Sequence, residues 1–184
     1  MSEPEINHAM HSVEGYKMKS LITFSSKSGN TRKLAEAIEN VLPGVSVLKP
    51  IEENPNIEGF DIIFVGFWLQ AGLADNQASA YLKRLNGAKP LFLFATHGAA
   101  TDSDHARKGM ELARDLVSSP EVIGTFSCQG EVKAEFLAKA KTMKPLPPWV
   151  EDAANAVGHP DEGDLDRLRE TVMDAIKMVS SLHS

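Results

Sequence analysis

One stretch near the start of the chain, residues 21–41, constrains the fold more than any other part of the sequence. Residues 21–24 are apolar, β-branched or aromatic, which predicts a short buried strand. A hydroxyl-rich turn containing Gly29 follows directly. The next residues place apolar side chains at the spacing of one helix face, namely Leu34, Ala37, Ile38 and Val41. A strand, a tight polar loop and a helix start, in that order, can hold a phosphate on backbone N–H groups.

The chemistry of this loop narrows the kind of phosphate that it can bind. The loop contains neither GxxxxGK[ST] nor GxGxxG, which excludes the familiar nucleoside-triphosphate and dinucleotide motifs. It offers the hydroxyls of Ser26, Ser28 and Thr31 around Gly29, where the backbone can approach a ligand without a Cβ. This set suits one terminal phosphate. The alternative is a serine-rich turn in which Ser28 or Asn30 only caps the helix, although a cap needs one such side chain.

The rest of the chain alternates strands with helices. Four further strands are predicted, at residues 44–51, 61–68, 90–96 and 121–128. Amphipathic helices are predicted at 78–85, from a cap at Asp102 or Ser103 to residue 117, at 132–143, and from Asp161 or Asp164 to residue 179. The first of these strands ends in Pro50, as an edge strand can. This alternation predicts an α/β fold in which a doubly wound, five-stranded parallel sheet carries helices on both faces.

The loop at residues 26–31 resembles the [ST]-x-[ST]-G-x-T loop of flavodoxins, which grips the phosphate of FMN. The preceding strand, the following helix and the order of later elements agree with that family. The resemblance implies the flavodoxin-like strand order 2-1-3-4-5, with the ligand at the carboxyl ends of the strands beside the switch point. It also implies that non-covalent FMN is the cofactor. The residues expected at its phosphate are Ser26, Lys27, Ser28, Gly29, Asn30 and Thr31.

The same resemblance assigns a second flavin-contacting loop after the third strand. The residues implied there are Phe67, Trp68, Leu69 and Gln70. Trp68 matches the aromatic side chain that commonly covers the isoalloxazine ring in flavodoxins. Both Phe67 and Trp68 have an alternative role as core residues at the end of a buried strand.

A third loop follows the fourth strand and departs from the family pattern. The residues that the resemblance places at the flavin there are Thr96, His97 and Gly98. Flavodoxins often supply a stacking tyrosine from this loop, but this loop contains no tyrosine or tryptophan. Either His97 fills that place or it is a surface loop histidine.

A narrower resemblance concerns a branch of flavodoxin-family proteins associated with bilirubin reduction. Residues 126–130 and 66–68 are similar to the patterns of that branch. The similarity implies electron delivery to a tetrapyrrole reductase. Cys128, within the first of these patterns, is either a reactive thiol or a small apolar filler at a strand end.

Composition limits the partners and the compartment. With 184 residues and a net charge of −6, the chain suits one domain and disfavours nucleic acid as a partner. A single cysteine excludes an intramolecular disulfide and fits a reducing cytoplasm, and no stretch resembles a membrane span. We expect residues 1–18 to be a poorly ordered extension and residues 19–184 to form the domain. The oligomeric state is not predicted.

The function expected from these features is electron carriage by FMN between a reductase and an acceptor protein, without a catalytic side chain. Two alternatives remain open. The first is a flavin-dependent NAD(P)H oxidoreductase that acts on quinones or another small acceptor, and the second is a flavodoxin-like module without flavin. The oxidoreductase would need a second pocket. The proline-containing residues 144–160 are the one stretch long enough to wall such a pocket, and we expect them to pack over the surface instead.

Overall fold

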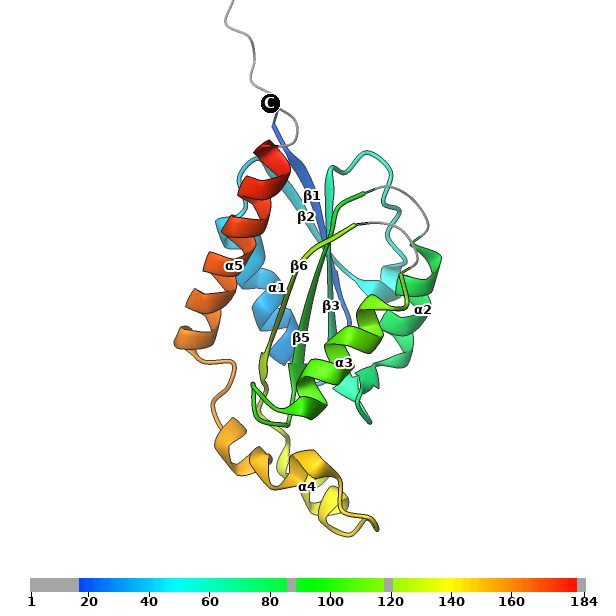
Figure 1. Ribbon diagram of the computed structural model, residues 1–184, viewed down its shortest axis with the longest axis vertical. Helices are drawn as coiled ribbons and strands as arrows, with labels where there is room; N and C mark the ends of the chain where they lie inside the picture. Colours follow the sequence, from blue (N-terminus) through cyan, green and yellow to red (C-terminus); the bar gives the residue numbers. More distant parts are fainter. Residues whose placement is uncertain (1–16, 86–88, 118–120, 182–184) are drawn as a thin grey trace, which may run out of the picture.

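The computed structural model describes residues 17–85, 89–117 and 121–181, and it shows a parallel sheet between two layers of helices (Figure 1). The five parallel strands lie in the order β2-β1-β3-β5-β6. Their bounds are β1 (Lys19–Phe24), β2 (Val45–Pro50), β3 (Ile62–Gln70), β5 (Leu91–His97) and β6 (Val122–Gln129). Numbered among themselves, these strands follow the predicted order 2-1-3-4-5. The predicted fold class is confirmed, and the proline-ended β2 lies at an edge of the sheet.

Helices cover both faces of the sheet and close two hydrophobic cores. The helices α1 (Asn30–Val41) and α5 (Glu162–Ser181) pack on one face with the core that contains Phe64. The opposite core, around Phe67, contains residues of α2 (Asn76–Arg84) and α3 (Asp104–Arg114). The inward face predicted for the last helix is confirmed, since all of its members are buried: Leu165, Leu168, Val172, Ile176 and Val179.

The third strand continues further than the sequence predicts and turns back on itself. After Gln70, a two-residue turn leads into β4 (Leu73–Ala74), which pairs antiparallel with the end of β3. Ala71 and Gly72 in the turn have φ angles of 51° and 80°. Positive φ at both central positions is typical of the type I′ turn, whose twist matches that of paired strands. The stretch after residue 68 is therefore a hairpin and not an open loop.

The chain between β6 and α5 forms a cap over the carboxyl edge of the sheet (Figure 1). We call residues 131–160 the cap segment; it contains α4 (Ala134–Lys141) and the 3-10 helices η2 (Pro148–Val150) and η3 (Asp152–Ala156). A further 3-10 helix, η1 (Ile51–Glu53), follows β2.

The helix predicted at residues 132–143 exists only as the shorter α4, and its expected inner face is wrong. Ala140 is the one residue of α4 that is buried, whereas the side chain of Phe136 is 40% exposed. Val132 precedes the helix and Met143 follows it. The reason is that α5, and not α4, occupies the sheet face beside α1, so α4 lies outside the two hydrophobic cores and packs against η2 of the cap segment.

Two further expectations concern the ends of the chain and membranes. Residues 1–16 of the predicted extension lie outside the described residues. Within the part of the chain that the structure describes, no helix has the length and apolar character needed to span a bilayer.

Candidate functional site

The loop between β1 and α1 is built as the sequence predicts, at the carboxyl end of a central strand. The backbone N–H of Ser25 donates to Gly66 O over 2.9 Å, which ties the loop to β3. Gly29 precedes α1 with a φ of +97°, which a residue with a Cβ rarely adopts. A Cβ at Gly29 would meet no atom within 4 Å, so the space in front of the loop is open. The N–H groups of the first turn of α1 lack acceptors within the helix, and this turn follows directly after the open position at Gly29.

The alternative in which Ser28 or Asn30 caps α1 is not what the structure shows. Gly29 is the capping residue and, as a glycine, has no side chain with which to cap α1. The amide of Asn30 instead donates to Glu131 O over 3.0 Å, which links the loop to the cap segment. The hydroxyl of Ser26 accepts from the N–H of Arg32 over 3.2 Å.

Thr31 lies beneath the loop. It is 1% exposed, and its Oγ1 lies 3.0 Å from the Oγ1 of Thr96 at the end of β5. The same hydroxyl donates to Phe67 O over 3.4 Å. These contacts fix the start of α1 against two strands. The proposed contact between the Thr31 hydroxyl and a phosphate stays a prediction.

A cavity of about 420 Å³ opens at this edge of the sheet. It brings together eight of the predicted site residues: Lys27, Ser28, Asn30, Trp68, Leu69, Thr96, His97 and Gly98. The sequence did not predict the other lining residues, which are His105 from the start of α3 and Gly130, Glu131, Val132, Lys133, Glu135, Phe136 and Trp149 from the end of β6 and the cap segment. The three predicted loops thus share one cavity, and the cap segment supplies a wall.

Five predicted residues do not line this cavity. Three of them, Ser26, Gly29 and Thr31, belong to the loop before α1 and to the first turn of that helix. Phe67 is fully buried in the core, as its alternative role requires. Gln70 is exposed and lines a second hollow of about 310 Å³, which it shares with Ser26. The half-buried Trp68 and the exposed Lys27 line both hollows, so these two residues lie between the two spaces.

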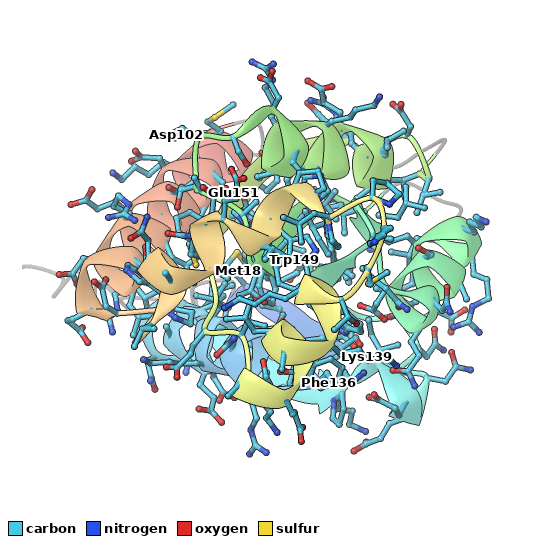
Figure 2. The ribbon with its side chains drawn as sticks, turned by 90° about the horizontal axis from the view of Figure 1, so that it is seen from below. Met18, Asp102, Phe136, Lys139, Trp149 and Glu151 are labelled. Carbon is cyan, nitrogen blue, oxygen red and sulfur yellow. The ribbon has the colours of Figure 1, made fainter. Side chains whose placement is uncertain are left out.

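Two aromatic rings from distant parts of the chain contact the same lysine. The Nζ of Lys27 lies 5.5 Å from the ring centroid of Trp68 and 4.3 Å from that of Phe136. Both distances are within the range of a cation–π interaction. Phe136 comes from α4, whose position over the carboxyl edge is visible in Figure 2. The ammonium group of this loop residue places a positive charge within reach of both aromatic rings.

Trp149 supplies an aromatic side chain to the third loop, which has none of its own. A Cβ on Gly98 would lie 3.1 Å from Cε3 of Trp149 and 3.0 Å from Cγ2 of Val132. The indole therefore packs on the backbone of the loop that follows β5. Figure 2 labels Trp149 in the cap segment, at this edge of the sheet. Trp149 also lines the cavity. This segment therefore does more than pack over the surface, because it helps to shape the cavity beside the predicted loops. The expectation that it forms no second pocket, of the kind an oxidoreductase would need, stays a prediction.

Polar contacts fasten the cap segment to the strand ends. The carboxylate of Asp152 accepts from the N–H of Ala100 over 2.8 Å, and Gln129 Nε2 donates to Asp152 O over 3.4 Å. The N–H of Gly130 donates to His97 O over 2.9 Å. A Cβ on Gly130 would lie 2.6 Å from the amide nitrogen of Asn30, so a larger residue there would displace the Asn30 side chain that donates to Glu131 O.

His97 is not a surface histidine. It ends β5, its side chain is 5% exposed, and its Nδ1 lies 2.9 Å from Ala99 O. Burial is the largest influence on the pKa of His97 and lowers it. The nearby His105 lowers this pKa further, whereas the bond to Ala99 O and the carboxylates of Asp152 and Asp164 oppose the shift. The imidazole is consequently neutral at pH 7.

Cys128 belongs to the core and not to the cavity. Its side chain is fully buried among apolar residues of the α1 and α5 layer. Burial, followed by the nearby carboxylate of Asp164, raises the pKa of the Cys128 thiol far above its usual range. A thiol in this state is a poor nucleophile, which supports its role as an apolar filler.

Comparisons with known proteins agree with this architecture. The family model for the flavodoxin domain matches residues 21–173. Among curated proteins, the chain is similar to two flavodoxin-like domain-containing proteins BilS. The protein from Clostridioides difficile strain CD3 is 29% identical over 160 residues, which cover 80% of this chain and 90% of the relative. The protein from Clostridium symbiosum strain WAL-14163 is 26% identical over 183 residues, 86% of this chain and 96% of the relative.

Solved structures show the same fold. Oxidised flavodoxin 2 from Bacillus cereus superposes with a TM-score of 0.54 at 16% identity, covering 87% of this chain and 99% of that one.

Proposed function

Because the chain belongs to the flavodoxin domain family, we propose that it binds FMN without a covalent bond and carries electrons between a reductase and an acceptor protein. One observation carries this proposal most directly. A single cavity joins the loop before α1 to the aromatic side chain of Trp68. That arrangement offers a phosphate site at one end and a flat apolar surface beside it.

The residues present fit FMN. The open loop at Gly29, the hydroxyl of Ser28 and the ammonium of Lys27 would hold a dianionic phosphate at the N-terminus of α1. Trp68 from β3 would stack on one face of the flavin ring, and Trp149 over Gly98 provides a second aromatic surface in the same cavity. The buried Nε2 of His97 is a further polar atom without a partner among the described residues. Bound FMN supplies the redox chemistry, and the protein binds it, orients it and limits access of water.

Electron carriage requires no catalytic side chain, and the size of the cavity suits it. A volume of about 420 Å³ lies near the low end of the range for small-molecule sites. Such a cavity has room for one flavin ring system, but a nicotinamide dinucleotide stacked on that ring would need considerably more. Cys128 is buried in the core away from the cavity, and the imidazole of His97 is neutral.

The NAD(P)H oxidoreductase remains the second candidate because of the cap segment. Its Phe136 and Trp149 build a wall over the site that a plain strand-to-helix connection would lack. If this wall moved outward, it could hold a flat substrate against the flavin. In an electron carrier the same segment would cover the flavin ring and limit access of solvent. The carrier and the oxidoreductase therefore differ in whether a nicotinamide nucleotide can contact the flavin.

The resemblance to the branch associated with bilirubin reduction suggests an acceptor. We propose a tetrapyrrole reductase as the protein that receives the electrons. The experiment is the transfer of electrons from photoreduced holoprotein to such an enzyme, measured as its product against a control with FMN alone. Product formation no faster than with free FMN would contradict this choice of acceptor.

Stopped-flow measurement of flavin absorbance in the FMN-loaded protein distinguishes an electron carrier from an NAD(P)H oxidoreductase. Mixed anaerobically with excess NADH or NADPH, a carrier keeps its oxidised flavin band for minutes. Addition of a catalytic amount of a flavodoxin reductase together with NADPH should then bleach the band. Rapid bleaching by either nucleotide alone would overturn the carrier and support the oxidoreductase.

A further inference from the structure

The imidazole of His97 is held in one tautomer by the loop that follows β5. Its Nδ1 lies 2.9 Å from the carbonyl oxygen of Ala99. A carbonyl oxygen only accepts hydrogen bonds, so Nδ1 carries a proton. Burial keeps the ring neutral near pH 7 because it lowers the pKa of His97. A neutral imidazole has one N–H, and Nε2 is therefore an acceptor.

This acceptor has no donor within the protein. The side chain of His97 is 5% exposed, and among the described residues nothing makes a hydrogen bond to Nε2. The charged side chains nearby do not supply one, because Asp152 and Asp164 are carboxylates that already accept from Ala100 N–H and from Asp161 N–H. Buried polar atoms without partners are rare in folded proteins, and each loses the hydrogen bonds it had with water.

His97, which carries this unpaired acceptor, lines the same cavity as the loop before α1 and Trp68. We infer that Nε2 of His97 accepts a hydrogen bond from an N–H or O–H group of bound FMN and so helps to select and orient the cofactor. This inference rests on the proposed binding of FMN. Apart from its phosphate, oxidised FMN offers two kinds of donor, the N3–H of the pyrimidine ring and the hydroxyls of the ribityl chain. Either would complete the only unmet hydrogen bond of a rigidly held ring.

The inference gives His97 a role that differs from stacking. A stacking residue presents the face of its ring and tolerates replacement by another flat side chain. An acceptor acts through one atom at one position. The Nδ1 contact to Ala99 O, in contrast, has a structural role, because it shapes the loop and fixes the tautomer. Two substitutions of His97 distinguish the role of Nδ1 from the role of Nε2.

The amide nitrogen of asparagine can take the place of Nδ1, and the amide group of glutamine can take the place of Nε2. His97→Asn thus keeps a donor toward Ala99 O but has no acceptor in the cavity. His97→Gln keeps an acceptor near the Nε2 position and loses the donor to the loop. FMN dissociation constants are measured by titrating each apoprotein into FMN and following flavin fluorescence, and the thermal midpoint of each apoprotein is measured as a control for folding.

The inference predicts that His97→Asn weakens FMN binding on the order of tenfold, while His97→Gln stays within about threefold of the unaltered protein. Unchanged affinity in His97→Asn would overturn it. An equal loss in both variants, or a larger loss in His97→Gln, would also overturn it, because the loop contact would then be the important one. If the unaltered protein does not bind FMN at all, the proposed function is contradicted. That result differs from the outcomes that contradict only the role of His97, in which the unaltered protein still binds FMN.

N3-methyl-FMN identifies the donor. If N3–H is the donor, methylation weakens binding to the unaltered protein and has a much smaller effect on His97→Asn. If a ribityl hydroxyl is the donor, methylation changes the affinity of both proteins by the same factor. Both results support the acceptor role, provided that His97→Asn has lost affinity for FMN itself.

Discussion

Trp149 packs its indole on the backbone of Gly98 so closely that a Cβ at residue 98 would lie 3.1 Å from Cε3 of the ring. This contact joins residues 51 positions apart in the sequence (149 − 98) and places the cap segment against the end of β5. It also explains how a loop without a large aromatic residue comes to have an aromatic surface beside it. The first prediction tests this contact.

Gly98→Ala should lower the free energy of unfolding by about 1–2 kcal/mol, because the added methyl group overpacks the site. In a Trp149→Ala background the same substitution should cost clearly less, since the indole is gone and only Val132 remains close. Urea denaturation of the four proteins gives the coupling between the two positions. Strictly additive losses would mean that the indole does not pack on Gly98.

Ser28→Asp should nearly abolish FMN binding and leave the fold intact. Ser28 is exposed and lines the cavity, so a carboxylate there costs the fold little, but it would lie beside the dianionic phosphate. Repulsion of like charges at contact distance in a partly dry loop is on the order of several kcal/mol. The control is Ser28→Asn, which has nearly the same shape without the charge and should keep most of the affinity. Full flavin occupancy in Ser28→Asp would show that the phosphate binds elsewhere.

Trp68→Ala should weaken FMN binding by about 1–3 kcal/mol, the range for the loss of an aromatic stack. It should also relieve the quenching of flavin fluorescence in the fraction that remains bound. Phe136→Ala is the matched control, because it removes the other ring that contacts Lys27 without touching β3. If Trp68→Ala lowers the thermal midpoint while the affinity for FMN stays the same, Trp68 is a core residue and not a stacking partner.

Cys128 should resist alkylation in the folded protein. Its thiol is fully buried, and burial raises its pKa far above the usual range, so almost no thiolate is available to react. Mass spectrometry after iodoacetamide treatment at pH 8 should show an unmodified chain, and the same treatment in denaturant should add one carbamidomethyl group. Fast modification of the native protein would place Cys128 at an accessible site.

The local elements were predictable because their signals lie close together in the sequence. The apolar run at residues 21–24, Gly29 and the helix spacing from Leu34 onward specify one strand, one turn and one helix. Parallel strands place their carboxyl ends at one edge, so Trp68 and Thr96 were expected beside the loop. The structure brings these predicted loops to one cavity.

The cap segment was not predictable in the same way. Its 3-10 helices have no periodic pattern, and Trp149 contributes to the site only through a long-range contact with Gly98. The spacing of Phe136 and Ala140 suggested an inner helix face, yet which layer a short helix packs on depends on which helix occupies the sheet, and α5 does so. A weak signal was present, since a glycine beside a strand end often marks close approach of another chain segment.

The most direct test of the account is the affinity of the apoprotein for FMN compared with riboflavin, measured by fluorescence titration under identical conditions. The account predicts that FMN binds at least about 100-fold more tightly, because the loop before α1 contacts a group that riboflavin lacks and charge-assisted hydrogen bonds to phosphate are strong. The purified protein should also carry FMN and be yellow. Equal affinity for the two flavins, or no binding of either, would contradict the central claim that residues 26–31 form a phosphate site.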